Sequence, residues 1–467
     1  APDPIGSIDA EGFHLLALNV LDGRGFSIAW DAPFCPNTVR TPVYPLYLAG
    51  VYRVLGRLPD AAVLTQILLE VLTTAWAVAL TRAACAGRGA GRMSAVSLVP
   101  GLLYAFNGTT QRYTGQLLSE ALLLPILASA VFATLRLVQK HTMRRGILAG
   151  LAWGLAVLTK PNVQYLALAA CGLALVSHRW RLLRRRNRPV AVALWASLLL
   201  VLLPWSVRNR VIAGRWMVST AFEDNVARVS AVATQAALLR LDVEPWTETW
   251  EHLYRQLAAT AGWDVTAEAG LSCADRLRQQ REIASAARAL VWTHRRIYVQ
   301  SHLWSTVRSV LDPGHRFWYQ LLSGATWETT GVVPDILGRM VWSLERRAVG
   351  DALSVFCRER LVRIPWHAAL LWWGLAGARP SLAVLGLRGF LGLVRGRLTI
   401  ALLFLGVVLY HIVLPGPIAH DRFYVPAIPI VCVLVSRGAE GYNDGYHCPT
   451  GYRRPREATT TSGGPND

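Results

Sequence analysis

Long apolar segments separated by short basic connections are the feature that most constrains how this chain folds. Hydrophobic residues make up 53% of the sequence and charged residues only 16%, whereas charged residues are about 25% of a typical soluble domain. A run of about 17–25 apolar residues matches the thickness of the bilayer core. The sequence therefore excludes a single soluble globule, a disordered chain and a secreted disulfide scaffold, and it predicts an all-α, polytopic transmembrane bundle.

Nine segments are apolar enough to be drawn as membrane spans. They are residues 59–82, 93–106, 117–138, 146–158, 162–178, 190–207, 363–377, 398–414 and 424–438. A further apolar stretch at 382–394 is too short for a span, so we expect a partly buried hairpin on the cytoplasmic side.

Basic connections without acidic residues set the predicted orientation. They lie at 82–92, 140–145 and 179–188, and loops rich in Lys and Arg favour the cytoplasmic side. The extracytoplasmic side then receives the N-terminal segment and residues 208–362, which hold more than half of the acidic residues. Because that long region combines helical spacing with mixed charge, we expect it to be helical and water-facing.

Five regions follow from this topology. They are a first extracytoplasmic loop with interfacial helices at 1–58, a transmembrane bundle at 59–207, an extracytoplasmic helical region at 208–362, C-terminal transmembrane helices at 363–438 and a disordered tail at 439–467.

The cysteines and the net charge exclude further classes of site. The seven Cys residues show no Cys-x-x-Cys pair and no Cys/His spacing suited to a metal, so we expect free thiols. The formal net charge is +19, and the basic residues lie in runs between apolar spans, a placement typical of membrane proteins. We therefore expect no nucleic-acid partner, no metal and no other cofactor; a divalent cation is not indicated.

Charged residues from separate segments fall on the predicted extracytoplasmic side, where they could surround one cavity. The acids are Asp9, Glu11 and Glu120, and the bases are Arg40, Lys160, Arg208 and Arg422. Charged groups kept at membrane depth usually mark a site. A carboxylate can accept a proton from a hydroxyl, and Arg or Lys can hold a departing phosphate. Since no Gly-rich nucleotide loop is present, the expected donor is a sugar on a lipid phosphate.

Short motifs occur in a fixed order along the chain. They read Ser-Ile-Asp-Ala-Glu-Gly at 7–12, Arg-Thr-Pro-Val-Tyr-Pro at 40–45, Leu-Ser-Glu at 118–120, Thr-Lys-Pro at 159–161, Pro-Trp-Ser-Val-Arg-Asn at 204–209 and Arg-Phe-Tyr-Val-Pro at 422–426. This set resembles the GT-C glycosyltransferases. It is most similar to family 39-like enzymes, including the protein mannosyltransferases and the aminoarabinose transferases of lipid A. The resemblance covers most of residues 5–438.

The resemblance implies a reaction and a place for it. A polyprenyl-phosphate sugar would be the donor, and a lipid, glycan or protein hydroxyl would be the acceptor. Transfer would occur with inversion on the extracytoplasmic side of an integral membrane protein, which we expect in a bacterial plasma (inner) membrane. The implied catalytic residues are Asp9, as the base, and Glu120. The implied phosphate-binding residues are Arg40, Lys160, Arg208 and Arg422. We expect substrate contacts from Glu11, Tyr44, Tyr113, Asn209 and Tyr424.

The chain departs from the family pattern at three places. The family usually has a helix before the first loop, and the printed sequence begins without one. Ala-Phe-Glu-Asp-Asn at 221–225 stands where a Gly-Gly-Asn-type turn is common. Lys160 stands where Arg is more usual, so the charge is kept but bidentate geometry is lost.

Structural interpretations remain open beside the functional ones. Asp9 can cap a helix that begins near Ala10, Glu11 can be a solvated first-turn acid, and the basic residues can be interfacial anchors. Glu70, near the middle of its span, can be protonated or pair with Gln66. The alternative functions are a polytopic transporter or lipid flippase, with charges at the midplane, and an inactive GT-C-like scaffold.

Overall fold

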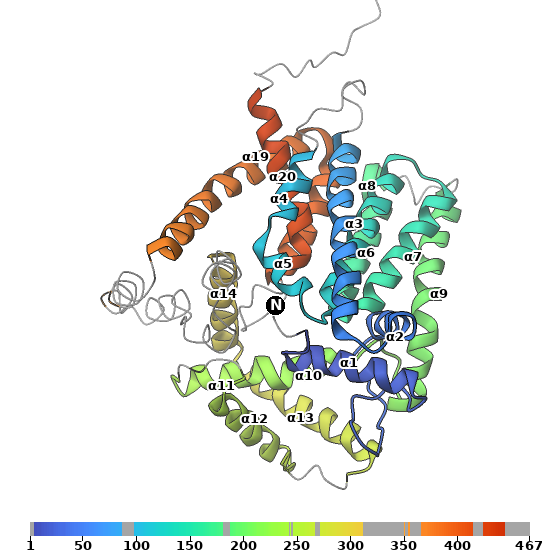
Figure 1. Cartoon of the computed structure of the whole chain (residues 1–467), viewed down its shortest axis with the longest axis vertical. Helices are drawn as coiled ribbons and strands as arrows, with labels where there is room; N and C mark the ends of the chain where they lie inside the picture. Colours follow the sequence, from blue (N-terminus) through green and yellow to red (C-terminus); the bar gives the residue numbers. More distant parts are fainter. Residues whose placement is uncertain are drawn as a thin grey trace, which may run out of the picture.

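A bundle of apolar helices forms the upper part of the molecule in Figure 1. The computed structural model describes residues 4–85, 98–180, 187–241, 243, 246–266, 271–311, 350, 354, 366–413 and 424–443. The bundle contains α3 (Pro59–Cys85), α4 (Val99–Ala105), α6 (Ser119–Gln139), α7 (Met143–Thr159), α8 (Gln164–Trp180) and α9 (Arg188–Ala213). Helix α6 lies between α3 and α7, and α7 packs on α9.

Three described helices are long and apolar enough to cross a membrane. They are Pro59–Ala84, Ser119–Gln139 and Arg188–Ala213, and shorter apolar helices cover Arg397–Val413 and Val425–Gly438. Predicted spans 59–82, 117–138 and 190–207 coincide with the three long helices. The prediction of an all-α transmembrane bundle is confirmed.

Glycines bring α7 and α9 into close contact. Gly146, Gly150 and Gly154 recur every four residues on α7, the small-residue spacing that lets membrane helices approach. A Cβ atom on Gly150 would lie 2.1 Å from the Ser197 Oγ and 2.2 Å from the Leu194 carbonyl oxygen. These contacts fix α7, whose last turn leads directly to Lys160.

The C-terminal helices differ from the prediction. Helix α19 (Trp366–Val413) is interrupted only at Arg397, where the backbone is non-helical, and α20 (Ile428–Asn443) packs along it. The hairpin expected around 382–394 is therefore wrong, because this segment is continuous helix. Its small residues explain the difference: a Cβ on Gly389 would lie 1.9 Å from the Leu434 carbonyl oxygen. Residues 439–443 of the predicted disordered tail belong to α20, and the rest of the tail, from 444 onward, lies outside the described residues.

Further helices gather at one end of the bundle, shown at the bottom of Figure 1. They are α1 (Ile8–Leu21), α2 (Val43–Leu55), α10 (Ala221–Asn225), the π-helix η5 (Val226–Ala231), α11 (Val232–Leu238), α12 (Glu248–Thr260) and α13 (Cys273–Thr293); α14 (Arg295–Leu311) rises beside the bundle. Helices α11 to α13 and η5 enclose a small core of their own, which includes Val232, Trp250, Leu253 and Ile283. We refer to α10–α13 with η5 as the cap.

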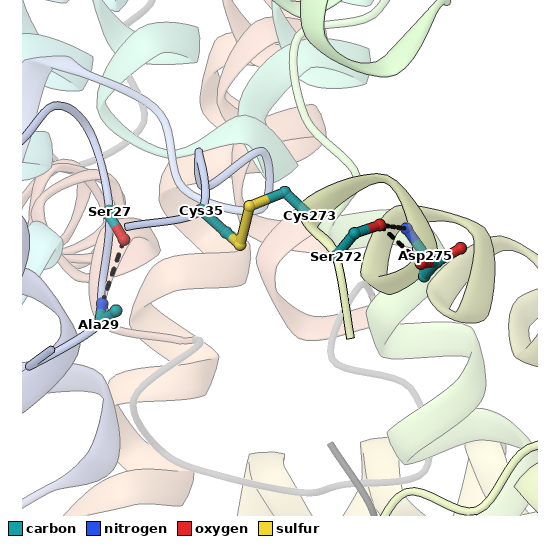
Figure 2. Close-up of a disulfide and its surroundings, with 6 residues drawn as sticks. All are labelled: Ser27, Ala29, Cys35, Ser272, Cys273 and Asp275. Atoms are coloured by element: carbon teal, nitrogen blue, oxygen red, sulfur yellow. Dashed lines mark hydrogen bonds between the residues drawn. A yellow bond between two sulfur atoms is a disulfide. The ribbon is translucent and has the colours of Figure 1, made fainter. Parts of the chain in front are cut away.

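A disulfide joins the first loop to the cap. Cys35 and Cys273 are bonded across 238 residues of sequence, at the start of α13 (Figure 2). The expectation of free thiols is wrong for these two residues, whereas Cys171 and Cys432 are free and buried. Spacing along the sequence could not reveal the bond, because its two halves come from different regions of the fold.

Candidate active site

Asp9 lies at the start of α1 in an ion pair with Arg40. The Arg40 Nη2 donates to the Asp9 Oδ1 over 2.9 Å. The helix is capped by Ser7, whose hydroxyl accepts from the Ala10 amide, so Asp9 is not the N-cap residue. The Asp9 side chain is 46% exposed, which leaves its carboxylate accessible to a second molecule.

The surroundings of Arg40 hold its guanidinium in place. It lies 4.1 Å from the ring centroid of Phe13, a cation–π contact. Gly12 leaves the space that this position requires, because a Cβ there would lie 2.8 Å from the Arg40 Nη2. Helix α1 therefore carries the carboxylate of Asp9 and also the two residues, Gly12 and Phe13, against which the Arg40 guanidinium packs.

Glu120 and Lys160 form a second ion pair, deeper in the molecule. Glu120 lies in the first turn of α6, and Lys160 lies between α7 and the short 3-10 helix η2 (Pro161–Val163). The Lys160 Nζ donates to the Glu120 Oε1 over 2.7 Å, and the Glu120 side chain is only 1% exposed. The pair fixes the end of α7 to the start of α6.

Arg208, near the end of α9, is held differently. Its Nη1 donates to the Asn37 carbonyl oxygen and to the Asn209 Oδ1, each over 2.8 Å. The guanidinium also lies 4.4 Å from the Trp205 ring and 5.3 Å from the Phe26 ring. Within the described ranges no carboxylate pairs with Arg208. Its positive charge is thus not offset by an acidic partner there.

Backbone contacts tie the loop that carries Arg40 to the segment after α9. The Thr220 amide donates to the Thr38 carbonyl oxygen over 2.9 Å, and the two threonine hydroxyls are 3.1 Å apart. The Ser219 hydroxyl donates to the Val39 carbonyl oxygen. Together with Arg208 and the disulfide, these bonds place the first loop against the cap.

The remaining predicted site residues are dispersed. Glu11 accepts from the Trp30 Nε1 over 3.2 Å, and residues two apart on a helix do not face each other, so it points away from Asp9. Tyr44 is fully buried and donates to the Gln66 Oε1. Their proposed substrate contacts stay predictions.

The other three predicted substrate residues, Tyr113, Asn209 and Tyr424, make contacts within the protein. Tyr113 is packed in the core, and Asn209 donates to the Val218 carbonyl oxygen over 2.9 Å. Tyr424 packs against the same core as Tyr113. Arg422 lies outside the described residues.

Two features of this region were not predicted. One is the Cys35–Cys273 bond, and the other is an ion pair between Asp224 and Arg228, whose Nε donates over 3.1 Å. The i,i+4 spacing of Asp224 and Arg228 is a signal that could have revealed the second. Among the residues that the structure describes, no group of three or more His, Cys, Asp or Glu could hold a metal ion.

One region of the chain is similar to a known protein family. Residues 39–206 match the family model described as dolichyl-phosphate-mannose-protein mannosyltransferase. The chain resembles the GT-C glycosyltransferases. The match spans just over a third of the chain and includes Arg40, Glu120 and Lys160, whereas Asp9 and Arg208 lie outside it. Together with the apolar helices, the match makes this region of the chain similar to membrane glycosyltransferases of the GT-C type.

The chain also has a weak similarity to a solved structure. The crystal structure of ArnT from Cupriavidus metallidurans in the apo state is 13% identical, with a TM-score of 0.36, and the alignment covers 93% of this chain and 72% of that chain. No curated protein matches the chain.

Proposed function

We propose that the protein transfers a sugar from a polyprenyl-phosphate donor to a hydroxyl of a lipid, glycan or protein acceptor. The observation that carries the proposal is the exposed Asp9 carboxylate beside Arg40. Arg40 lies on the loop whose Asn37 carbonyl oxygen accepts a hydrogen bond from Arg208. Asp9 accepts the proton of the acceptor hydroxyl. The acceptor oxygen bonds to the anomeric carbon as the bond from that carbon to the phosphate oxygen breaks, and the electron pair leaves with the lipid phosphate. Direct attack inverts the anomeric carbon.

Arg208 is the described cation best suited to hold that phosphate. Arg40 and Lys160 are each paired with a carboxylate, which offsets their charge, whereas Arg208 donates to a neutral amide side chain and a carbonyl group. An incoming phosphate would therefore meet an uncompensated guanidinium, and charged hydrogen bonds of this kind are the strong ones. Arg422 keeps its predicted role on the same side.

The disulfide supports an extracytoplasmic site. Disulfides form and persist in oxidising compartments and are rare where thiols are kept reduced. Since Cys35 lies in the first loop and Cys273 in the cap, the bond favours a position for both regions on the oxidising side of the membrane. This agrees with the orientation predicted from the basic connections, and we assign the protein to a plasma membrane with its site facing outward.

Substitution of the predicted base tests the function. Purified protein is given polyprenyl-phosphate sugars and candidate acceptors, and transfer is measured for wild type and Asp9→Asn. Because loss of a general base costs about 10²–10⁴-fold in rate, Asp9→Asn should retain only a small fraction of the activity. Asp22→Asn is the matched control, since it makes the same change at the other end of α1, where Asp22 pairs with Arg57. Equal transfer by Asp9→Asn and wild type would remove Asp9 from its role.

A further inference from the structure

A second ion pair lies in the cap, within electrostatic range of the Asp9–Arg40 pair. In α10, Asp224 accepts from the Arg228 Nε over 3.1 Å, and both side chains are about one-third exposed. The Asp224 amide donates to the Thr220 carbonyl oxygen, and the Thr220 amide donates to the Thr38 carbonyl oxygen. Asp224 therefore lies one helical turn from a residue that is bonded to the loop carrying Arg40.

Both Asp9 and Arg40 contribute to the pKa of Asp224. Burial raises the pKa of Asp224, the charge and hydrogen bond of Arg228 lower it, Arg40 lowers it further, and the charge of Asp9 raises it. The two carboxylates thus act on each other, and Arg40 acts on both. Alternating charges on Asp9, Arg40, Asp224 and Arg228 make one electrostatic group.

The neighbouring acid behaves differently. Glu223 accepts from the Arg215 Nη1 over 2.6 Å, and the Arg288 Nη1 lies 3.9 Å away. Glu223 is therefore paired with Arg215, from the segment before the cap, whereas Asp224 is bonded to Arg228 and lies within electrostatic reach of Asp9. Two adjacent acids of one short helix provide a natural comparison.

We propose that Asp224 is a positioning residue that keeps Arg40 at the reaction site while Asp9 changes its charge. The proposal rests on the proposed role of Asp9 as the base. When the acceptor O–H bond breaks and its proton bonds to the Asp9 carboxylate, Asp9 becomes neutral and Arg40 loses its partner charge. The negative charge of Asp224 remains to attract the guanidinium, so Arg40 stays in place as negative charge develops on the leaving phosphate.

Other charged groups surround this electrostatic group. Those near it are Glu251 and Tyr254 of α12, Arg288 of α13, Arg215 and Glu223 next to Asp224, and Lys160 beside η2, which contacts α10. Arg228 also lies 4.3 Å from the Tyr254 ring, and its carbonyl oxygen accepts from the Trp250 Nε1, so its position is fixed by the cap.

Kinetic comparison of the two acids tests the proposal. Asp224→Asn should lower kcat about tenfold with little change in the donor KM, because a charged interaction is lost in the reacting state. The acid limb of the kcat/KM profile should move about 0.5–1 pH unit lower, since removal of a nearby negative charge favours ionised Asp9. Asp224→Glu should restore both quantities in part, and Glu223→Gln should leave the acid limb in place. An unmoved limb in Asp224→Asn, or an equal shift in Glu223→Gln, would overturn the proposal.

A readout without turnover separates this proposal from the proposed function. The Asp9 carboxyl carbon is titrated by NMR in protein labelled at aspartate, with Asp9→Asn used to assign the signal. A lower Asp9 pKa in Asp224→Asn than in wild type supports the coupling even if no sugar is transferred, in which case the proposed function alone fails. An unchanged Asp9 pKa in an active enzyme refutes the coupling and leaves the function standing.

Discussion

The two acid–base pairs share their chemistry but differ in the exposure of their carboxylates. Asp9 is 46% exposed and Glu120 is 1% exposed, whereas their partners Arg40 and Lys160 are 16% and 12% exposed. A solvated pair contributes little to stability and leaves its carboxylate accessible. A buried pair is strongly destabilised when one member is lost. The exposed carboxylate suits the proposed role of Asp9 as the base, whereas the Glu120 carboxylate is held by Lys160 and joins two helices, and its catalytic role stays a prediction.

Loss of Glu120 should give the largest effect on stability. Glu120→Ala leaves Lys160 buried without the Glu120 carboxylate and should cost about 3–5 kcal/mol of unfolding free energy, measured by thermal unfolding in detergent. Asp9→Asn should cost less than about 1 kcal/mol in the same assay, because its carboxylate is partly exposed to solvent and the amide still accepts from Arg40. The double variant Glu120→Leu/Lys160→Met should recover part of the loss. Equal destabilisation by Glu120→Ala and Asp9→Asn would erase the contrast between the pairs.

Breaking the disulfide tests what holds the exposed pair in position. Cys35→Ser should destabilise the contact between the first loop and the cap by about 2–4 kcal/mol. Hydrogen exchange of residues 27–40 and of α13 measures this loss, and Cys273→Ser should reproduce it without further loss in the double variant. Cys171→Ser, which removes a free thiol in the bundle, is the control. Unchanged exchange in residues 27–40 would show that the backbone bonds to Ser219 and Thr220 suffice.

Arg208 sharpens the comparison because it has no acidic partner in the described chain. Arg208→Ala should weaken binding of the polyprenyl-phosphate donor by about 1.5–3 kcal/mol, the value of a charged hydrogen bond. Arg208→Lys should recover part of that affinity, since it keeps the charge and loses the planar geometry. Donor affinity is measured by titration of the purified protein. Arg210→Ala, an exposed change on the same helix, is the control, and donor binding that is the same in all variants would contradict the assignment.

Part of this arrangement could be predicted from sequence. Charge bias fixed a side for each connection, so Asp9, Arg40, Glu120, Lys160 and Arg208 were expected on one face. Their pairing could not be predicted, because it depends on distances between segments that are 31 and 40 residues apart in the chain. Hydropathy identifies the side of a residue but carries no information on which opposite charge it will meet.

The failures have a common physical cause. The Cys35–Cys273 bond and the continuous helix around Gly389 both depend on contacts with another region, α13 in one case and α20 in the other. Local composition described 382–394 correctly as short and apolar, yet close packing of small residues made it part of a longer helix. Long-range contacts of this kind have no signature in a single sequence.

Substitution of Glu70, an acid inside α3 that accepts hydrogen bonds from two neutral hydroxyls, has the smallest expected effect and is the last test of the comparison. Tyr104 and Thr114 each donate a hydroxyl hydrogen bond to its carboxylate. Glu70→Gln keeps an acceptor for one hydroxyl, and the other can reorient toward the amide, so it should cost about 0.5–1.5 kcal/mol in thermal unfolding. Sugar transfer should stay at the wild-type level. Glu70→Leu, which leaves both hydroxyls without that acceptor, should cost more in unfolding. If Glu70→Gln instead abolished transfer while remaining folded, the bundle acid would share the chemistry, and exposure would no longer separate functional from structural carboxylates in this protein.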